Sequence, residues 1–283
     1  MRRILVPLFG NKRDKIGLQA ALALASSEKI HIDARLFQRD PDDIIMYVGE
    51  GASANMIGDI IQQSKQLAKD RLVKVTSTFE AWRKAGKIVD GPLSSGDTSS
   101  ADLKEIVGHI PTSLVAPATV ADVCIFARTV EDSDADLESL TEMALFESGR
   151  PVLLVPDEEV KTIGRRIVIG WNGSAEAARA VAVAMPLLCQ AEAVFVIAVG
   201  DTDDIADPSE LVTTLKINEI EAAALTVTPK DGVTEALLSE AHKVSADLLV
   251  IGAYSHNRLR EFVMGGVTRD LRENPSIATL LVR

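Results

Sequence analysis

The same succession of segments occurs twice in this sequence. Arg3-Ile-Leu-Val-Pro-Leu-Phe-Gly10 is matched by Arg166-Ile-Val-Ile-Gly-Trp-Asn-Gly173, 163 residues further on. Asp122-Val-Cys-Ile-Phe-Ala127 is matched by Asp247-Leu-Leu-Val-Ile-Gly252 at a separation of 125 residues, and Leu153-Leu-Val155 by Leu280-Leu-Val282 at 127. Two copies of one unit are the simplest explanation. The shrinking separation places the additional length of the first copy in its middle.

Short apolar runs alternate with segments of helical spacing in both copies. We expect strands at residues 4–8, 31–37, 123–127 and 151–155, and then at 166–171, 193–199, 222–227, 248–251 and 277–282. Helices are expected at 16–26, about 54–79, 98–107 (capped by Asp97 or Thr98), 137–146, from 175 onward, 208–217, 233–244 and 257–271. This alternation predicts an α/β fold of two tandem, doubly wound parallel-sheet modules. We place them at residues 1–157 and 165–283, with a linker at 158–164.

Composition restricts the class of protein. Hydrophobic residues make up 47% of the chain and charged residues 25%, which favours a globular fold over disorder. The net charge of −11 opposes binding to nucleic acid and to anionic membranes, and no segment is apolar enough to predict a membrane span. Cys124 and Cys189 lack the spacing of metal ligands and are expected to be small buried residues. We expect a cytoplasmic protein.

One stretch of the second copy carries a candidate binding site. The apolar run Leu248–Ile251 ends at Gly252, a polar loop follows, and helical spacing resumes at Leu259, Phe262 and Val263. A strand, a loop of small residues and a helix N-terminus together present main-chain N–H groups to an anion. Ligands of parallel sheets bind beyond the carboxyl ends of the strands, at the point where strand order reverses. The pattern therefore predicts a phosphate site in the second module, between its first and fourth strands.

This stretch resembles the universal stress protein family, whose nucleotide-binding members carry G-x2-G-x9-G-[ST] after the fourth strand. Gly252 and Gly265 match two of the four motif positions, while Ser255 and Gly266 replace the others and Thr268 follows two residues later. The resemblance extends to both halves of the chain. It implies five-stranded parallel sheets of the HUP, or adenine nucleotide alpha hydrolase-like, fold. It also implies pairing of the two modules through their fifth strands as a pseudo-dimer, with a homodimer as a further expectation.

The same resemblance assigns the ligand and its contacts. Family members that bind nucleotides have an acidic residue after strand one, where this chain has Asn172 in the second module and Phe9 in the first. We therefore expect the first module to lack a site, and the second to bind ATP or another adenine nucleotide (ADP or AMP) with Mg²⁺. The candidate contacts are Trp171, Asn172, Gly173, Val199, Gly252, Tyr254, Ser255, Asn257, Arg258, Gly265, Gly266, Val267 and Thr268.

Plainer interpretations of these residues remain open. Gly252 also fits the end of a strand, Gly265-Gly266 the end of a helix, and Trp171 a core residue at the sheet edge. His31, His109 and His242 are scattered and predict no metal site, and we assign no catalytic residue. The first hypothesis is a stress-response module that binds an adenine nucleotide. The alternatives are a scaffold that acts through dimerisation without a ligand, and a slow ATP hydrolase.

Overall fold

The computed structural model of the chain describes residues 1–24, 29–40, 54–92, 99–128, 135–158, 160–200, 206–229, 232–253 and 277–283. Strands and helices alternate along it. The first half contains β1 (Arg3–Leu8), α1 (Lys12–Leu24), β2 (His31–Gln38), α2 (Ala54–Ala85), β3 (Val89–Asp90), β4 (Ser100–Val107), α3 (Ile110–Thr119), β5 (Val123–Ala127), α4 (Ala135–Glu147) and β6 (Val152–Val155). The second half contains β7 (Arg166–Gly170), α5 (Ala175–Leu188), β8 (Ala193–Val199), α6 (Pro208–Ile217), β9 (Ala222–Val227), α7 (Val233–Lys243), β10 (Leu248–Gly252) and β11 (Ala278–Val282).

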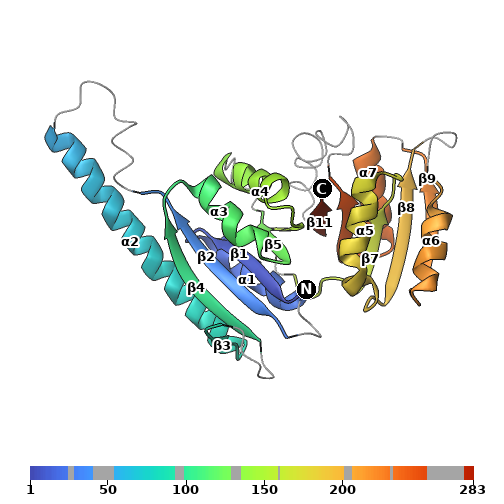
Figure 1. Cartoon of the computed structure of the whole chain (residues 1–283), viewed down its shortest axis with the longest axis horizontal. Helices are drawn as coiled ribbons and strands as arrows, with labels where there is room; N and C mark the ends of the chain where they lie inside the picture. The colour runs from blue at the N-terminus through green and yellow to red at the C-terminus, as the bar shows by residue number, and fades with distance from the viewer. Residues whose placement is uncertain are drawn as a thin grey trace.

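All eleven of these strands form one sheet. Its order is β3-β4-β2-β1-β5-β6-β11-β10-β7-β8-β9. Neighbouring strands are parallel except at the centre, where β6 and β11 pair antiparallel through Leu153 and Leu280. Away from this junction, the strand order read outward is the same on both sides, apart from the two-residue β3 at one edge (Figure 1). Each side therefore has its own reversal of strand order, between β1 and β5 and between β7 and β10.

Helices cover both faces of the sheet. On one face, α1 and α2 pack on the first half and α5 and α6 on the second, in one continuous apolar cluster that includes Phe79, Trp82 and Leu215. The opposite face is packed by α3, α4 and α7 through a second cluster that includes Leu114, Leu145 and Leu238. The α/β architecture with a large parallel sheet, predicted from the alternating pattern, is thus confirmed. Among the described residues, no helix is both long and apolar enough to span a bilayer.

Most of the predicted elements are present, but the prediction for the middle of the first half was wrong. Residues 100–107 form strand β4, which pairs in parallel with β2 over eight residues, and not the expected helix. Helix α3 was not predicted; Pro111 stands in its first turn and Pro117 lies inside it. The expected helix at 257–271 lies outside the described residues.

The two cysteines differ in their surroundings. Cys124 is buried in β5, and burial raises the pKa of its thiol to about 12. Cys189 follows α5 and is exposed, so the expectation that it is buried was wrong. Neither thiol belongs to the candidate site described next.

Candidate functional site

The predicted site residues that the structure describes lie at the carboxyl edge of the second half. Trp171, Asn172 and Gly173 follow β7, while Val199 ends β8 and Gly252 ends β10. These strands are neighbours in the order β10-β7-β8, so the structure brings the three segments to one edge of the sheet. The remaining candidates lie outside the described residues: Tyr254, Ser255, Asn257, Arg258, Gly265, Gly266, Val267 and Thr268.

The turn from β7 into α5 is built by local hydrogen bonds. Gly173 has φ +69°, a conformation that side chains disfavour, and a Cβ there would lie 2.6 Å from the Cβ of Ala206. Asn172 Oδ1 accepts a hydrogen bond from the Ser174 N–H at 3.1 Å. Ser174 caps the helix, since its Oγ accepts from the Ala177 N–H at 3.1 Å. Because Asn172 and Gly173 are exposed, a helix N-terminus and a solvent-facing amide lie side by side at this edge.

Gly252 has a packing role that its sequence context did not reveal. A Cβ at this position would lie 2.4 Å from the Ala177 nitrogen and 2.5 Å from the Glu176 carbonyl carbon. The first turn of α5 therefore fills the space that a side chain would take. Gly252 is one of the predicted ligand contacts, but the group that approaches it in the structure is the first turn of α5.

Trp171 and Val199 are partly buried. Trp171 packs against the cluster under α5, and its main-chain N–H donates to the Ile197 carbonyl at 2.9 Å. Val199 packs against the cluster on the opposite face. Both residues thus have packing partners of their own, in keeping with the plainer interpretation of Trp171.

The equivalent turn in the first half is filled by charged side chains. Gly10 has φ +77°, close to that of Gly173, so the turn itself is repeated. Here the carboxylate of Asp14, from the first turn of α1, accepts hydrogen bonds from the N–H groups of Phe9 at 2.7 Å and Gly10 at 2.9 Å. A Cβ at Gly10 would meet Arg71 Cγ at 2.6 Å, so α2 also reaches this turn. Side chains of the first half therefore cover its turn, whereas Asn172 and Gly173 in the turn of the second half are exposed.

Asp14 is only 2% exposed, and this burial governs its titration. Burial raises the pKa of Asp14, and the hydrogen bonds from Phe9 and Gly10 offset only part of that rise. The sequence patterns did not single out Asp14 as a functional residue. The signal available was an aspartate four residues after the repeated glycine, a position that Ala177 occupies in the second copy.

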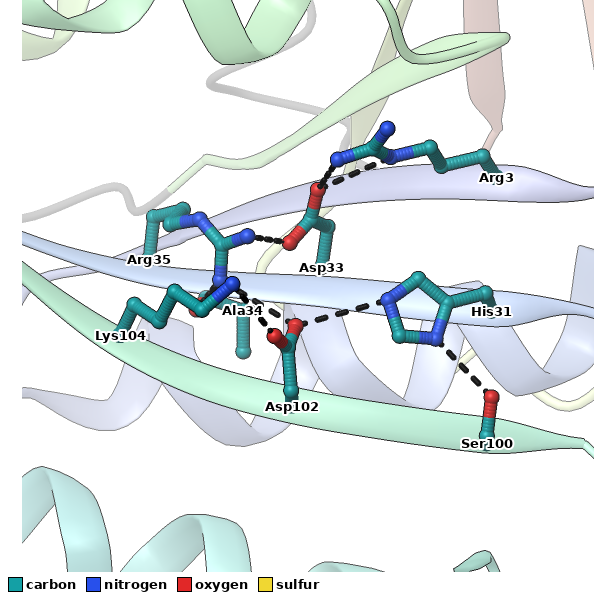
Figure 2. Close-up of polar contacts among 8 residues, drawn as sticks. All are labelled: Arg3, His31, Asp33, Ala34, Arg35, Ser100, Asp102 and Lys104. Atoms are coloured by element: carbon teal, nitrogen blue, oxygen red, sulfur yellow. Dashed lines mark hydrogen bonds and ion pairs between the residues drawn. The ribbon is translucent and has the colours of Figure 1, made fainter. Parts of the chain in front are cut away.

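A second polar cluster lies between β2 and β4 (Figure 2). Side chains alternate along both strands, so His31, Asp33 and Arg35 face Ser100, Asp102 and Lys104 across the parallel register. Asp33 is fully buried and pairs with Arg35 and with Arg3 of β1, whose Nε lies 3.0 Å from Asp33 Oδ2. Asp102 forms salt bridges with Arg35 (Nη1 to Oδ1, 3.2 Å) and with Lys104 (Nζ to Oδ2, 3.0 Å). These contacts form a network of two carboxylates and three cations.

His31 completes this network. Its Nδ1 is 2.9 Å from Ser100 Oγ, and its Nε2 is 3.5 Å from Asp102 Oδ1. Burial lowers the pKa of His31, although the charge of Asp102 acts in the opposite direction. Burial alone would raise the pKa of Asp102, but the hydrogen bond from Lys104 and the charge of Arg35 outweigh it and hold that pKa below its usual value.

Ligand-type atoms of His31, Asp33 and Asp102 lie within 4.8 Å of one another, a grouping that the scattered histidines of the sequence did not indicate. A divalent cation at their centre would have to displace guanidinium groups that already neutralise both carboxylates. The network thus has the character of an ion-pair cluster that holds β1, β2 and β4 together. The alternating charges of residues 31–35 and 100–104 were a signal for it, once both segments are strands in register.

Comparison with known proteins matches the fold but not the sequence. No protein family and no curated protein is matched by the sequence of this chain. A universal stress protein from Archaeoglobus fulgidus DSM 4304 is similar in structure with a TM-score of 0.68 and 14% identity, covering 99% of this chain and 96% of that one. A putative universal stress protein from Pseudomonas aeruginosa UCBPP-PA14 matches at TM-score 0.53 and 14% identity, covering 100% and 93%. A protein of unknown function from Pseudomonas aeruginosa PAO1 matches at 0.53 and 14%, covering 100% and 92%.

These matches run along nearly the entire length of both partners. The chain therefore has the universal stress protein fold throughout.

Proposed function

We propose that this chain is a tandem universal stress protein whose second module, residues 165–283, binds an adenine nucleotide. The first module, residues 1–157, provides a pairing surface, and residues 158–164 join the two. The fold match over 99% of the chain supports the family assignment. The internal repeat supports the division into modules, because each half contains the same outward strand order.

The observation that carries the nucleotide proposal is the contrast between the two repeated turns. In the turn that follows β7, an exposed Asn172 lies next to the N-terminus of α5. After β1, the buried Asp14 carboxylate accepts hydrogen bonds from the main-chain N–H groups of the turn, and the Arg71 side chain packs against Gly10. A nucleotide phosphate would be repelled by the Asp14 carboxylate at the first turn, where the main-chain donors are already bonded. The second turn has Ala177 at the position of Asp14 and leaves the Asn172 amide exposed for the nucleoside end of a ligand. The second turn is therefore the better nucleotide site.

The roles of the ligand-contacting residues follow the family resemblance. Asn172 would hydrogen-bond the nucleoside end, since its amide both donates and accepts. Main-chain amides of Gly265 and Gly266, the Thr268 hydroxyl and the Arg258 guanidinium would contact phosphate oxygens. Any Mg²⁺ would be held chiefly by those phosphates, as is usual for this ion.

Thermal unfolding in the presence of ATP, ADP and AMP, each with and without Mg²⁺, tests the proposal. A ligand that binds the folded state raises its stability by mass action, by about 2.7 kcal/mol at a hundred times Kd. Asn172→Ala should remove most of the nucleotide-induced shift. Asn11→Ala is the matched control, because Asn11 Oδ1 likewise accepts from the N–H two residues on, that of Arg13 at 3.0 Å. Equal loss of the shift in both variants, or no shift in the wild type at millimolar nucleotide, would reject the site.

A ligand-free scaffold is the second candidate, and one observation favours it. The absence of a side chain at Gly252 is required by the contact with α5, so this glycine does not by itself indicate a ligand. In that case the protein would act through its surfaces, with the β6–β11 pairing as the internal counterpart of a family dimer. The thermal-shift series separates the two candidates. Phosphate release from ATP, measured on the same samples, tests the slow hydrolase.

A further inference from the structure

A hollow of about 270 Å³ lies at the junction of the two halves. The first half contributes the end of α4 and the residues that follow it, and the second half contributes α5 and the end of β11. The lining residues are Leu145, Phe146, Gly149, Arg150, Arg179, Val282 and Arg283. Leu145 and Val282 are buried, so they form the floor, while the arginines stand at the exposed rim. The hollow is at the end of β11 and not between β7 and β10, where the nucleotide is proposed to bind.

Its charge is positive in a protein that is otherwise strongly acidic. Of the seven described residues that line it, three are arginines and none is acidic, although the chain carries a net charge of −11. Arg179 pairs with Glu176 of its own helix at 2.7 Å. Arg150 donates through Nε to the Thr119 carbonyl at 2.8 Å, and Arg283 lies over the Phe146 ring with its Cζ 4.4 Å from the centroid. Among the described residues, neither Arg150 nor Arg283 forms a salt bridge.

These contacts orient the guanidinium groups and leave donors available. A guanidinium has five N–H donors in a planar fork, and the Thr119 carbonyl takes only the Nε–H of Arg150. The Phe146 ring supports Arg283 through its face, so the in-plane N–H groups of Arg283 are not used by that contact. A planar N–H fork matches two oxygens of a phosphate, and three guanidinium groups line this one hollow.

We propose that this hollow binds a phosphate dianion, held by Arg150 from the first half and by Arg179 and Arg283 from the second. A bound phosphate would connect the two halves next to the β6–β11 pairing, and so would stabilise the junction. The volume accommodates a phosphate group with a small substituent, and Phe146 and Val282 provide apolar surface for one. This inference does not depend on nucleotide binding by the second module.

The test is ³¹P NMR or calorimetric titration of the full chain with two probes, inorganic phosphate and phenyl phosphate. Arg150→Gln and Arg283→Gln should each weaken binding about tenfold, the equivalent of 1.4 kcal/mol for one lost charge-assisted pair, and the double variant should show no saturable binding. Arg165→Gln is the control, because Arg165 pairs with Glu192 outside the hollow and should leave the affinity unchanged. Tighter binding of phenyl phosphate identifies an ester as the ligand, and equal binding identifies free phosphate.

Two results would overturn the site. One is the absence of saturable phosphate binding in the wild type. The other is phosphate binding that survives in the double variant while circular dichroism shows that variant to be folded. Asn172→Ala separates this site from the nucleotide site, because it should leave the phosphate affinity as it is. If Asn172→Ala and the double arginine variant abolished phosphate binding equally, the hollow would not be a separate site and the proposal would fail.

Discussion

The two halves place the same glycine turn after their first strand, at opposite edges of the sheet because β6 and β11 are antiparallel, but surround it differently. Gly10 and Gly173 have φ angles of +77° and +69°, and both lead into a helix. In the first half, the buried Asp14 binds the turn amides; in the second, a Ser174 cap leaves Asn172 exposed. The same turn can therefore have its main-chain N–H groups bonded to a buried carboxylate or lie beside an exposed amide, without a change of fold. The difference between the halves lies in a few side chains around the turn.

The two halves also differ in the contacts between their first and second strands. Arg3 and Arg166 occupy equivalent places at the start of β1 and β7, and each faces the second strand of its half. Arg3 pairs with Asp33, whereas Arg166 lies over the Phe195 ring at 5.6 Å. The first half therefore stabilises this face with buried charges, and the second with an aromatic contact.

The largest expected effect is a loss of stability at Gly252, where the second half has no room for a side chain. Gly252→Ala should lower the free energy of unfolding by about 2–3 kcal/mol, because the new Cβ would overlap the main chain of α5. The equivalent residue in the first half is Ala127, and Ala127→Gly should cost only about 1 kcal/mol. Urea unfolding followed by circular dichroism measures both. Wild-type stability in Gly252→Ala would mean that the helix and strand are not in close contact.

Asp14→Ala tests the closed turn of the first half. It leaves the N–H groups of Phe9 and Gly10 without their acceptor, which should cost about 1–3 kcal/mol. Ser174→Ala, which removes the cap of the open turn, should cost about 1 kcal/mol. The same unfolding measurement applies. If Asp14→Ala proved as stable as the wild type, the carboxylate would not be the group that closes the turn.

Asn172→Asp should sharpen the difference in binding between the halves. The substitution is nearly isosteric and keeps an oxygen for the Ser174 N–H, while it supplies the charged acceptor that the family carries. We expect ATP affinity to rise about tenfold, or 1.4 kcal/mol, measured by calorimetric titration. Phe9→Asp, the same change in the first half, should create no new binding. A second binding event in that variant would contradict the assignment of Asp14 as the blocking group.

The smallest expected effect is a pH dependence confined to the first half. Because the folded-state pKa of His31 lies below its ordinary value of 6.5, the unfolded chain binds its proton more readily. The stability contributed by neutral His31 is present above pH 6.5 and is lost as the pH falls below it. His31→Gln should therefore lose less stability between pH 7.5 and pH 5 than the wild type does. Equal losses in both proteins, measured by urea unfolding, would mean that His31 does not titrate as its burial implies.

The sequence predicts elements well where their pattern is local. Helix α6 and strand β9 have the bounds that residues 208–217 and 222–227 predicted, since turn residues and apolar runs delimit them. Strand β4 was misread because Asp102, Lys104 and Glu105 suggest an exposed helix. The carboxylates of Asp102 and Glu105 are explained by β2, which supplies His31, Arg35 and Gln38 as partners across the sheet, and Lys104 pairs with Asp102.

The candidate site follows the same rule. The equivalence of Gly10 and Gly173 was visible in the repeat, because a turn with positive φ needs glycine in both copies. The roles of Asp14 and Gly252 depend on how α1 and α5 pack against strand ends, and no local pattern encodes that packing. The junction hollow combines Arg150 and Arg283, which are distant in sequence and meet only because β6 pairs with β11.

Calorimetric titration of the wild-type chain with Mg-ATP tests the central claim most directly, because it counts sites. We predict one nucleotide per chain, with binding lost in Asn172→Ala and kept in Asn11→Ala. Two nucleotides per chain, or a single one that Asn11→Ala removes and Asn172→Ala does not, would contradict the account.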